Sequence, residues 1–163
     1  MPKIQLQILS NLHLEAPAAY DTFEITPRGP VLALLGDIGR DPGWIQFLER
    51  QLSLFRTVLL VLGNYEPYNS SWAQVREQIR DFNSAHEKNR QQGQGQLVLL
   101  DQGRYDVTDD FTILGSTLHS QIDAKHEEHV SFGLNDFYYI EDAGTSRSTV
   151  KYTRMTWRGS TAK

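Results

Sequence analysis

The sequence predicts an α/β fold built around parallel strands. Two segments, 31–35 and 58–62, are almost unbroken apolar runs, which is typical of parallel strands covered on both faces. Between them, Asp41-Pro42-Gly43 is followed by apolar residues at helical spacing, with proline near the helix start. Strand, helix and strand in this order indicate a βαβ unit.

The remaining elements follow from the same periodicities. Residues 4–9 alternate apolar and polar side chains, which predicts a first strand with one wetter face. A second helix should begin near Ser71 and carry Val75, Ile79 and Phe82 on one face, ending before a glutamine- and glycine-rich loop, 91–96. Two further strands are expected, Leu97–Leu100 and Phe111–Gly115, with the turn between them supplied by Asp101 to Asp110.

Composition predicts one domain, 1–163, and excludes several classes of function. The chain has 163 residues, no cysteine and a formal charge of −4. With no basic field, we expect no nucleic-acid binding. The sequence has no signal segment and no apolar run of membrane-spanning length, so we expect a cytoplasmic protein with no membrane contact.

Three polar stretches follow the first three predicted strands. They are Ser10-Asn11-Leu12-His13, Gly36-Asp37-Ile38-Gly39 and Gly63-Asn64-Tyr65-Glu66. The carboxyl ends of parallel strands meet at one edge of the sheet, which is where open α/β sheets bind ligands. We therefore expect a small-molecule pocket at these strand ends.

The three stretches resemble the first three signatures of the calcineurin-like metallophosphoesterases, D-x-H, G-D-x-x and G-N-H-E. The resemblance implies an αββα-type sandwich, with a mixed sheet and flanking helices. In that family the first signature gives an Asp and a His to one metal and the second gives a bridging Asp. The third gives an Asn to the other metal and a His that assists the leaving group. Here His13, Asp37 and Asn64 match that pattern, whereas Asn11 and Tyr65 depart from it.

The resemblance covers residues 3–142 and leaves the tail 143–163 unmatched. The later histidines of the family, including a closing G-H-x-H segment, are absent from the sequence, so we expect a truncated form of the fold. His119 and the Leu134-Asn135-Asp136-Phe137 stretch resemble segments that precede those histidines in some members. We therefore predict a ligand-binding set that combines these positions with the strand ends: Asn11, Asn64, Glu66, His119, Asn135 and Asp136.

The two departures weaken a metal centre. An amide at Asn11 in place of a carboxylate removes a negative charge, which leaves Asp37 as the anionic ligand of the set. We therefore expect either no cofactor or one weakly bound divalent metal (Mn, Fe, Zn or Mg) on His13, Asp37 and Asn64. Hard cations of this kind need several oxygen or imidazole ligands.

The same residues suit metal-free proton transfer. His13 is the candidate general base, Asp37 an orienting carboxylate, and Tyr65 a candidate acid, since a phenol donates a proton but does not replace an imidazole near neutral pH. A purely structural turn role is an open alternative for Asp37 and Asn64, which lie next to glycines.

Three functions remain open at this point. The first is a metallophosphoesterase-like protein with a degraded two-metal site that is not a competent phosphatase and is reused for metal-independent acid/base chemistry on a small molecule. The second is a weak one-metal phosphodiesterase or phosphatase. The third is a non-catalytic binding or regulatory subunit. An uncovered sheet face favours a homodimer, with Tyr138, Tyr139 and Trp157 as contact candidates.

Overall fold

A four-stranded parallel sheet forms the centre of the protein. The computed structural model describes residues 4–16, 18–40, 42–119 and 122–143. The strands lie in the order β1 (Leu6–Leu9), β2 (Val31–Leu35), β3 (Thr57–Val61) and β4 (Gln96–Leu99), and every neighbouring pair is parallel. Three of the four strand positions agree with the predicted apolar runs to within one residue.

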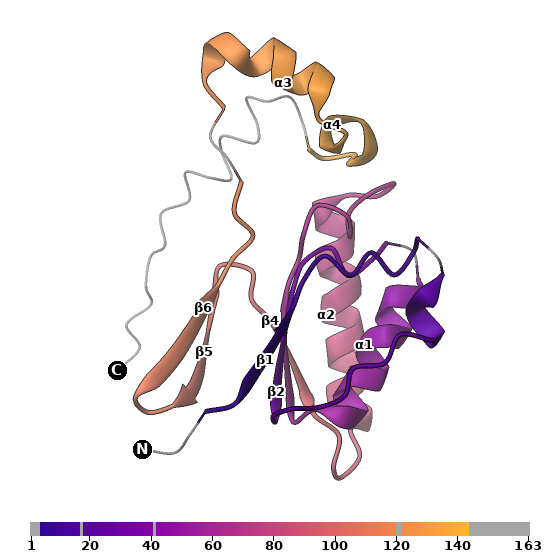
Figure 1. The fold of residues 1–163 in the computed structure, drawn as a ribbon, viewed down its shortest axis with the longest axis vertical. Helices are drawn as coiled ribbons and strands as arrows, with labels where there is room; N and C mark the ends of the chain where they lie inside the picture. The colour runs from indigo at the N-terminus through magenta and orange to yellow at the C-terminus, as the bar shows by residue number, and fades with distance from the viewer. Residues whose placement is uncertain (1–3, 17, 41, 120–121, 144–163) are drawn as a thin grey trace.

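Two helices cover one face of this sheet (Figure 1). Helix α1 (Gly43–Leu54) buries Trp44, Phe47, Leu48 and Leu52, which recur at the spacing expected for one helical face. Helix α2 (Trp72–Asn89) is capped at its N-terminus by Ser71, whose hydroxyl accepts a hydrogen bond from the backbone N–H of Gln74. Both helices pack on the sheet to form the main apolar core, and a short 3₁₀ helix, Ala19–Asp21, lies before β2.

An antiparallel hairpin packs on part of the opposite face. It consists of β5 (Gly103–Thr108) and β6 (Phe111–Gly115), and Tyr105 and Ile113 pack against a second apolar cluster that includes Ala33 and Leu59. The prediction of a turn from Asp101 to Asp110 was therefore wrong. The segment Gly103–Thr108 is rich in polar residues, so its sequence alone does not indicate a strand. Its strand conformation depends on antiparallel pairing with β6.

Two short helices lie beyond the carboxyl ends of the strands (Figure 1). They are α3 (Glu127–Gly133), preceded by a 3₁₀ turn at Ala124–His126, and α4 (Asp136–Tyr139). Backbone hydrogen bonds join this segment to the β3–α2 loop, from Asn69 N to Tyr139 O (2.7 Å) and from Glu141 N to Ser70 O (2.8 Å). The end of the described chain is thereby held next to the start of α2.

The predicted α/β architecture is confirmed, with a parallel sheet, flanking helices and a second, smaller sheet layered on it. None of the helices within the described residues is both long enough and apolar enough to cross a bilayer. The predicted contact residue Trp157 lies outside the described residues.

Candidate functional site at the strand ends

Backbone pairing between the first two loops continues past the ends of the strands. The N–H groups of Asn11, His13 and Leu14 donate to the carbonyls of Gly36, Asp37 and Ile38, at 3.0, 3.0 and 2.9 Å. Because this pairing is made by the backbone, it fixes the two polar stretches side by side whatever their side chains do. The expectation that these stretches meet at one edge of the sheet is met.

Three residues of these paired loops adopt left-handed backbone conformations. Asn11, His13 and Asp37 have φ values of 53°, 47° and 53°. Non-glycine residues rarely adopt positive φ, and such strain clusters at functional sites. Three such residues lie on these two adjacent loops, and Asn, His and Asp are the residue types that adopt this region most readily.

The loop after β3 comes close to the loop after β2. A Cβ on Gly63 would lie 2.2 Å from Asp37 Oδ1, and a Cβ on Gly36 would lie 2.7 Å from Gly63 Cα. Glycine is needed at both positions because any side chain would separate the loops. This close approach brings the third polar stretch against the other two.

The three candidate catalytic residues are neighbours. The rings of His13 and Tyr65 meet edge to face, with centroids 4.2 Å apart, and the backbone N–H of Tyr65 donates to Asp37 Oδ1 at 3.1 Å. Glu15 lies beside His13, its Oε1 3.6 Å from His13 Nδ1, with only 6% of its side chain exposed. His13 is thus placed between a phenol ring and a buried carboxylate.

Glu66 lies underneath this group as a buried structural carboxylate. Its Oε1 accepts the Ile38 N–H at 2.7 Å, and its Oε2 accepts the N–H groups of Gly63 (2.7 Å) and Asp37 (3.3 Å). Burial raises the pKa of Glu66, and these backbone donors oppose that rise. With both oxygens bonded to the backbone, Glu66 serves to join two loops, and the structure gives no support to the predicted ligand contact.

Asn64 is bonded to a residue far along the chain. Its Nδ2 donates to Asp136 Oδ1 at 2.7 Å and to the Tyr68 hydroxyl at 3.2 Å, and the Tyr68 hydroxyl itself donates to Asp136 Oδ1 at 2.7 Å. Burial, followed by the Asp136 carboxylate, raises the pKa of Tyr68 far above its ordinary value. These bonds fix α4 against the strand-end loops.

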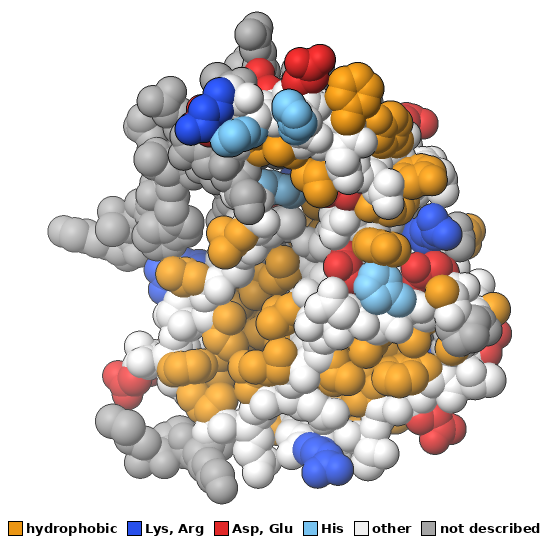
Figure 2. Space-filling view, turned by 45° about the horizontal axis from the view of Figure 1, so that its top comes forward, with side chains coloured by type: hydrophobic (Ala, Val, Ile, Leu, Met, Phe, Trp, Pro, Cys, Tyr) orange, Lys and Arg blue, Asp and Glu red, His pale blue; other side chains and the backbone are white. Residues whose placement is uncertain are grey.

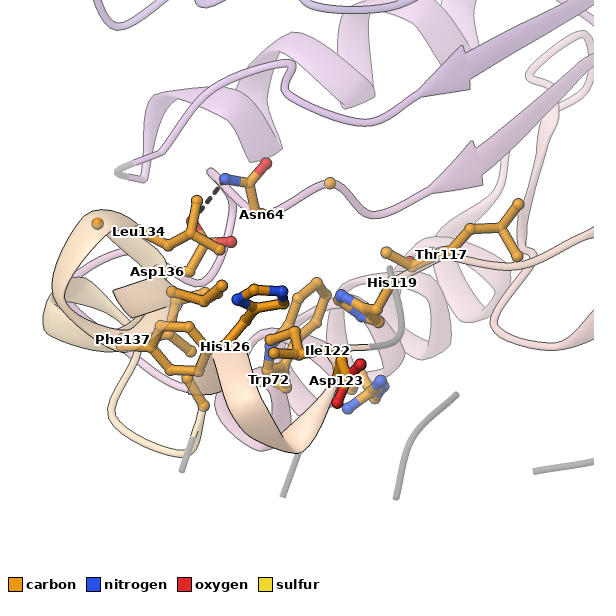
Figure 3. Close-up of a pocket in the computed structure, with 17 residues that line it drawn as sticks. Asn64, Trp72, Thr117, His119, Ile122, Asp123, His126, Leu134, Asp136 and Phe137 are labelled. Atoms are coloured by element: carbon orange, nitrogen blue, oxygen red, sulfur yellow. Dashed lines mark hydrogen bonds between the residues drawn. The ribbon is translucent and has the colours of Figure 1, made fainter. Parts of the chain in front are cut away.

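A pocket of about 870 Å³ opens beside Asn64, between the start of α2 and the segment 117–143. Figure 3 shows Asn64, Trp72, His119, Asp136 and Phe137 around it. The His119 ring meets the Trp72 ring edge to face, with centroids 5.5 Å apart. Burial lowers the pKa of His119, which keeps the imidazole neutral near pH 7.

The predicted site residues fall into two groups. His13, Asp37 and Tyr65 lie together at the strand ends, with Asn11 exposed next to them and hydrogen-bonded to Ser10 Oγ at 3.2 Å. Asn64, His119 and Asp136 line the pocket, whereas Asn135 precedes α4 and makes no capping hydrogen bond with its side chain.

Most of the pocket residues were missed by sequence reasoning, among them Trp72 and Arg76. Trp72 and Arg76 line the pocket from the first turn of α2, and the guanidinium carbon of Arg76 lies 5.4 Å from the centroid of the Trp72 ring. Because they are four residues apart on a helix, these two side chains lie on the same helix face. Many residue pairs share that spacing, so it does not by itself indicate a pocket.

Metal-ligating side chains are sparsely grouped at the strand ends. Within the part of the chain that the structure describes, no three His, Asp or Glu side chains are grouped so that they could hold a metal ion. Asn64 directs its amide nitrogen to Asp136, and one oxygen of Asp37 accepts a backbone N–H.

A sequence relative exists in a giant virus. The chain is 31% identical over 156 residues to the uncharacterized protein L509 of Acanthamoeba polyphaga mimivirus, an alignment that covers 88% of this chain and 54% of the relative. The chain thus spans about half the length of the curated relative that it matches. No family model matches the sequence.

A solved structure shares the fold. The phosphopantetheinyl hydrolase of Mycobacterium tuberculosis superposes with a TM-score of 0.59 at 14% identity, covering 90% of this chain and 58% of that one. At this identity the similarity concerns the fold alone. The chain therefore shares the fold of that hydrolase over most of its length.

Proposed function

We propose that this chain is a phosphoesterase-like protein that does not act as a two-metal phosphatase and instead performs metal-independent proton transfer on a small molecule. The ring contact between His13 and Tyr65, together with the hydrogen bond from the Tyr65 backbone N–H to Asp37, is the observation that supports this function. His13 is the base, Tyr65 the acid, and Asp37 the carboxylate that orients the loop of Tyr65.

The proton-transfer function is tested with a generic substrate for a general base. In the Kemp elimination of 5-nitrobenzisoxazole, a base removes the proton from carbon while the ring N–O bond breaks to give a cyanophenolate. We expect a rate that resists EDTA and is lost in the His13→Gln variant but retained in His129→Gln, whose side chain is exposed on α3. A rate that is equal in both variants and in the wild type would exclude His13 as the base.

A weak one-metal phosphodiesterase is the second candidate, since His13 and Asp37 lie on loops joined by their backbones. It is tested by the hydrolysis of bis(p-nitrophenyl) phosphate with added Mn²⁺, with elemental analysis of the purified protein alongside. Our proposal expects no hydrolysis above that of the Asp37→Ala variant. Hydrolysis lost in Asp37→Ala but retained in Asp110→Ala, on the exposed hairpin, would establish the one-metal enzyme instead.

The third candidate is a homodimeric binding subunit. Large apolar side chains are exposed on β1 and β2, where Ile8 is 57% and Leu35 44% accessible, and hydrophobic side chains gather on the face seen in Figure 2. Tyr138 and Tyr139 are also exposed. Sedimentation at micromolar concentration tests it, since a single 18.6 kDa species would contradict a dimer.

A further inference from the structure

The pocket next to Asn64 is lined mainly by apolar side chains. The apolar side chains on its walls include those of Trp72, Ile122, Val130, Leu134, Phe137 and Ile140. Its volume of about 870 Å³ lies in the range of sites that enclose most of a small molecule. An apolar wall of this kind selects for an apolar body in the ligand.

The charges that line the pocket leave one carboxylate without a cation. Arg76 is paired with Asp101, Nε to Oδ2 at 2.7 Å, and Asp123 is paired with Lys125 at 3.2 Å. Asp136 has no cationic partner among the described residues. Its Oδ1 accepts hydrogen bonds from the neutral groups of Asn64 and Tyr68.

His119, one of the two described histidines that line the pocket, does not supply the missing charge. His119 is kept neutral by burial, and within the described chain its ring makes a contact with Trp72 but no hydrogen bond. A phosphate or carboxylate group beside Asp136 would therefore meet a negative charge that no described cation compensates, whereas a cation there would neutralise it.

We propose, on the basis of the function proposed above, that the pocket binds an apolar small molecule carrying one basic amine, whose ammonium group pairs with Asp136. The second oxygen of Asp136, Oδ2, accepts the N–H of the ammonium, while Asn64 and Tyr68 hold the carboxylate in place through Oδ1. The apolar body lies against Phe137 and Val130.

Three probes with one body and different head groups test this assignment. They are 4-phenylbutylamine, 4-phenylbutan-1-ol and 4-phenylbutanoate, and their affinities are measured by titration calorimetry at pH 7. We expect the amine to bind at least about tenfold more tightly than the carboxylate. The reason is that its ammonium group makes a charge-assisted hydrogen bond to Asp136 in a partly desolvated site. Tighter binding of the carboxylate, equal affinities, or no binding of any probe at millimolar concentration would overturn the assignment.

The Asp136→Asn variant identifies the residue responsible. Its amide oxygen still accepts from Asn64 and Tyr68, so the fold is preserved, and we expect the preference for the amine to disappear. Asp110→Asn, on the exposed hairpin, is the matched control and should keep the preference. A preference that survives in Asp136→Asn would overturn the assignment.

A second variant guards against misfolding of the first. Val130→Trp places a large side chain in the pocket and should weaken the binding of all three probes, with the near-ultraviolet circular dichroism of the fold retained. Unchanged binding would place the probes elsewhere. The outcome is separate from that of the elimination assay, because His13 does not line this pocket.

Discussion

The carboxylate of Glu66, in the loop after β3, accepts the backbone N–H of Ile38, in the loop after β2, at 2.7 Å. Two more backbone donors, from Gly63 and Asp37, are bonded to its other oxygen. A single buried side chain thus replaces the sheet hydrogen bonds that end with the strands. The position of Asp37 depends on this bond network, although Glu66 itself does not reach the pocket.

Replacement of Glu66 by glutamine should destabilise the fold by about 1–3 kcal/mol at low pH, because the amide NH₂ faces one of three backbone donors. The raised pKa of Glu66 means that the folded protein holds this proton more tightly than the unfolded chain does. The stabilisation that comes from binding this proton is therefore complete below the ordinary pKa of 4.5. It is lost as the pH rises through the pKa of Glu66 in the folded protein. The wild-type free energy of unfolding should fall over this window, and that of Glu66→Gln should not.

Urea unfolding between pH 4 and pH 8 measures both effects. Glu24→Gln, an exposed glutamate on the segment before β2, is the control and should stay within about 0.5 kcal/mol of the wild type. A difference between wild type and Glu66→Gln that stays constant with pH would contradict the role of burial at Glu66.

Replacement of Gly63 by alanine should destabilise the protein by about 1–3 kcal/mol, because the new Cβ would lie 2.2 Å from Asp37 Oδ1 and 2.5 Å from Asp37 N. Gly133→Ala, at the end of α3, is the matched control, since a Cβ there meets nothing within 4 Å. Urea unfolding should show that control unchanged or slightly more stable. Equal stabilities of the two variants would mean that the strand-end loops can separate freely.

The sheet and its two large helices could be predicted because the spacing of apolar residues within each segment is enough to indicate a strand or a helix. The apolar runs of β2 and β3 and the helical spacing of Trp44, Phe47 and Leu48 leave little choice of element. The hairpin strand β5 could not be identified in this way. Its stability comes from β6 and from Tyr105 packing on the sheet, and both are tertiary relationships.

The strand-end group could be predicted because parallel strands bring their ends together by topology. The partner of Asn64 could not, because Asp136 is 72 residues away and reaches it only through the packing of α4 on the β3–α2 loop. The pocket depends on that same long-range contact. Its charge balance, with Asp136 unpaired among the described residues, is likewise visible only in three dimensions.

Replacement of Tyr68 by phenylalanine should loosen α4, because it removes the hydroxyl that donates to Asp136 and accepts from Asn64. The loss of a hydrogen bond to a carboxylate should cost about 1.5–3 kcal/mol. Hydrogen exchange should accelerate at the backbone amides of 137–143. Tyr138→Phe is the control: the residue is 62% exposed, and its hydroxyl makes one long hydrogen bond, 3.5 Å to Phe132 O, so these rates should stay unchanged. Equal protection in both variants would show that α4 is held by other contacts.

Restoration of Asn11→Asp together with Tyr65→His should raise Mn²⁺ affinity by at least about tenfold, because it adds a carboxylate and an imidazole beside Asp37 and His13. The backbone should accept the first change, since Asn11 has a φ of 53° and aspartate tolerates this region as well as asparagine does. Calorimetric titration with Mn²⁺ measures the gain. Asn89→Asp with Tyr138→His adds the same two groups at the end of α2 and on α4, and should give no gain. A restored variant that binds no better than this control would show that the loops, even though their backbones are paired, do not hold their side chains in a metal-binding arrangement.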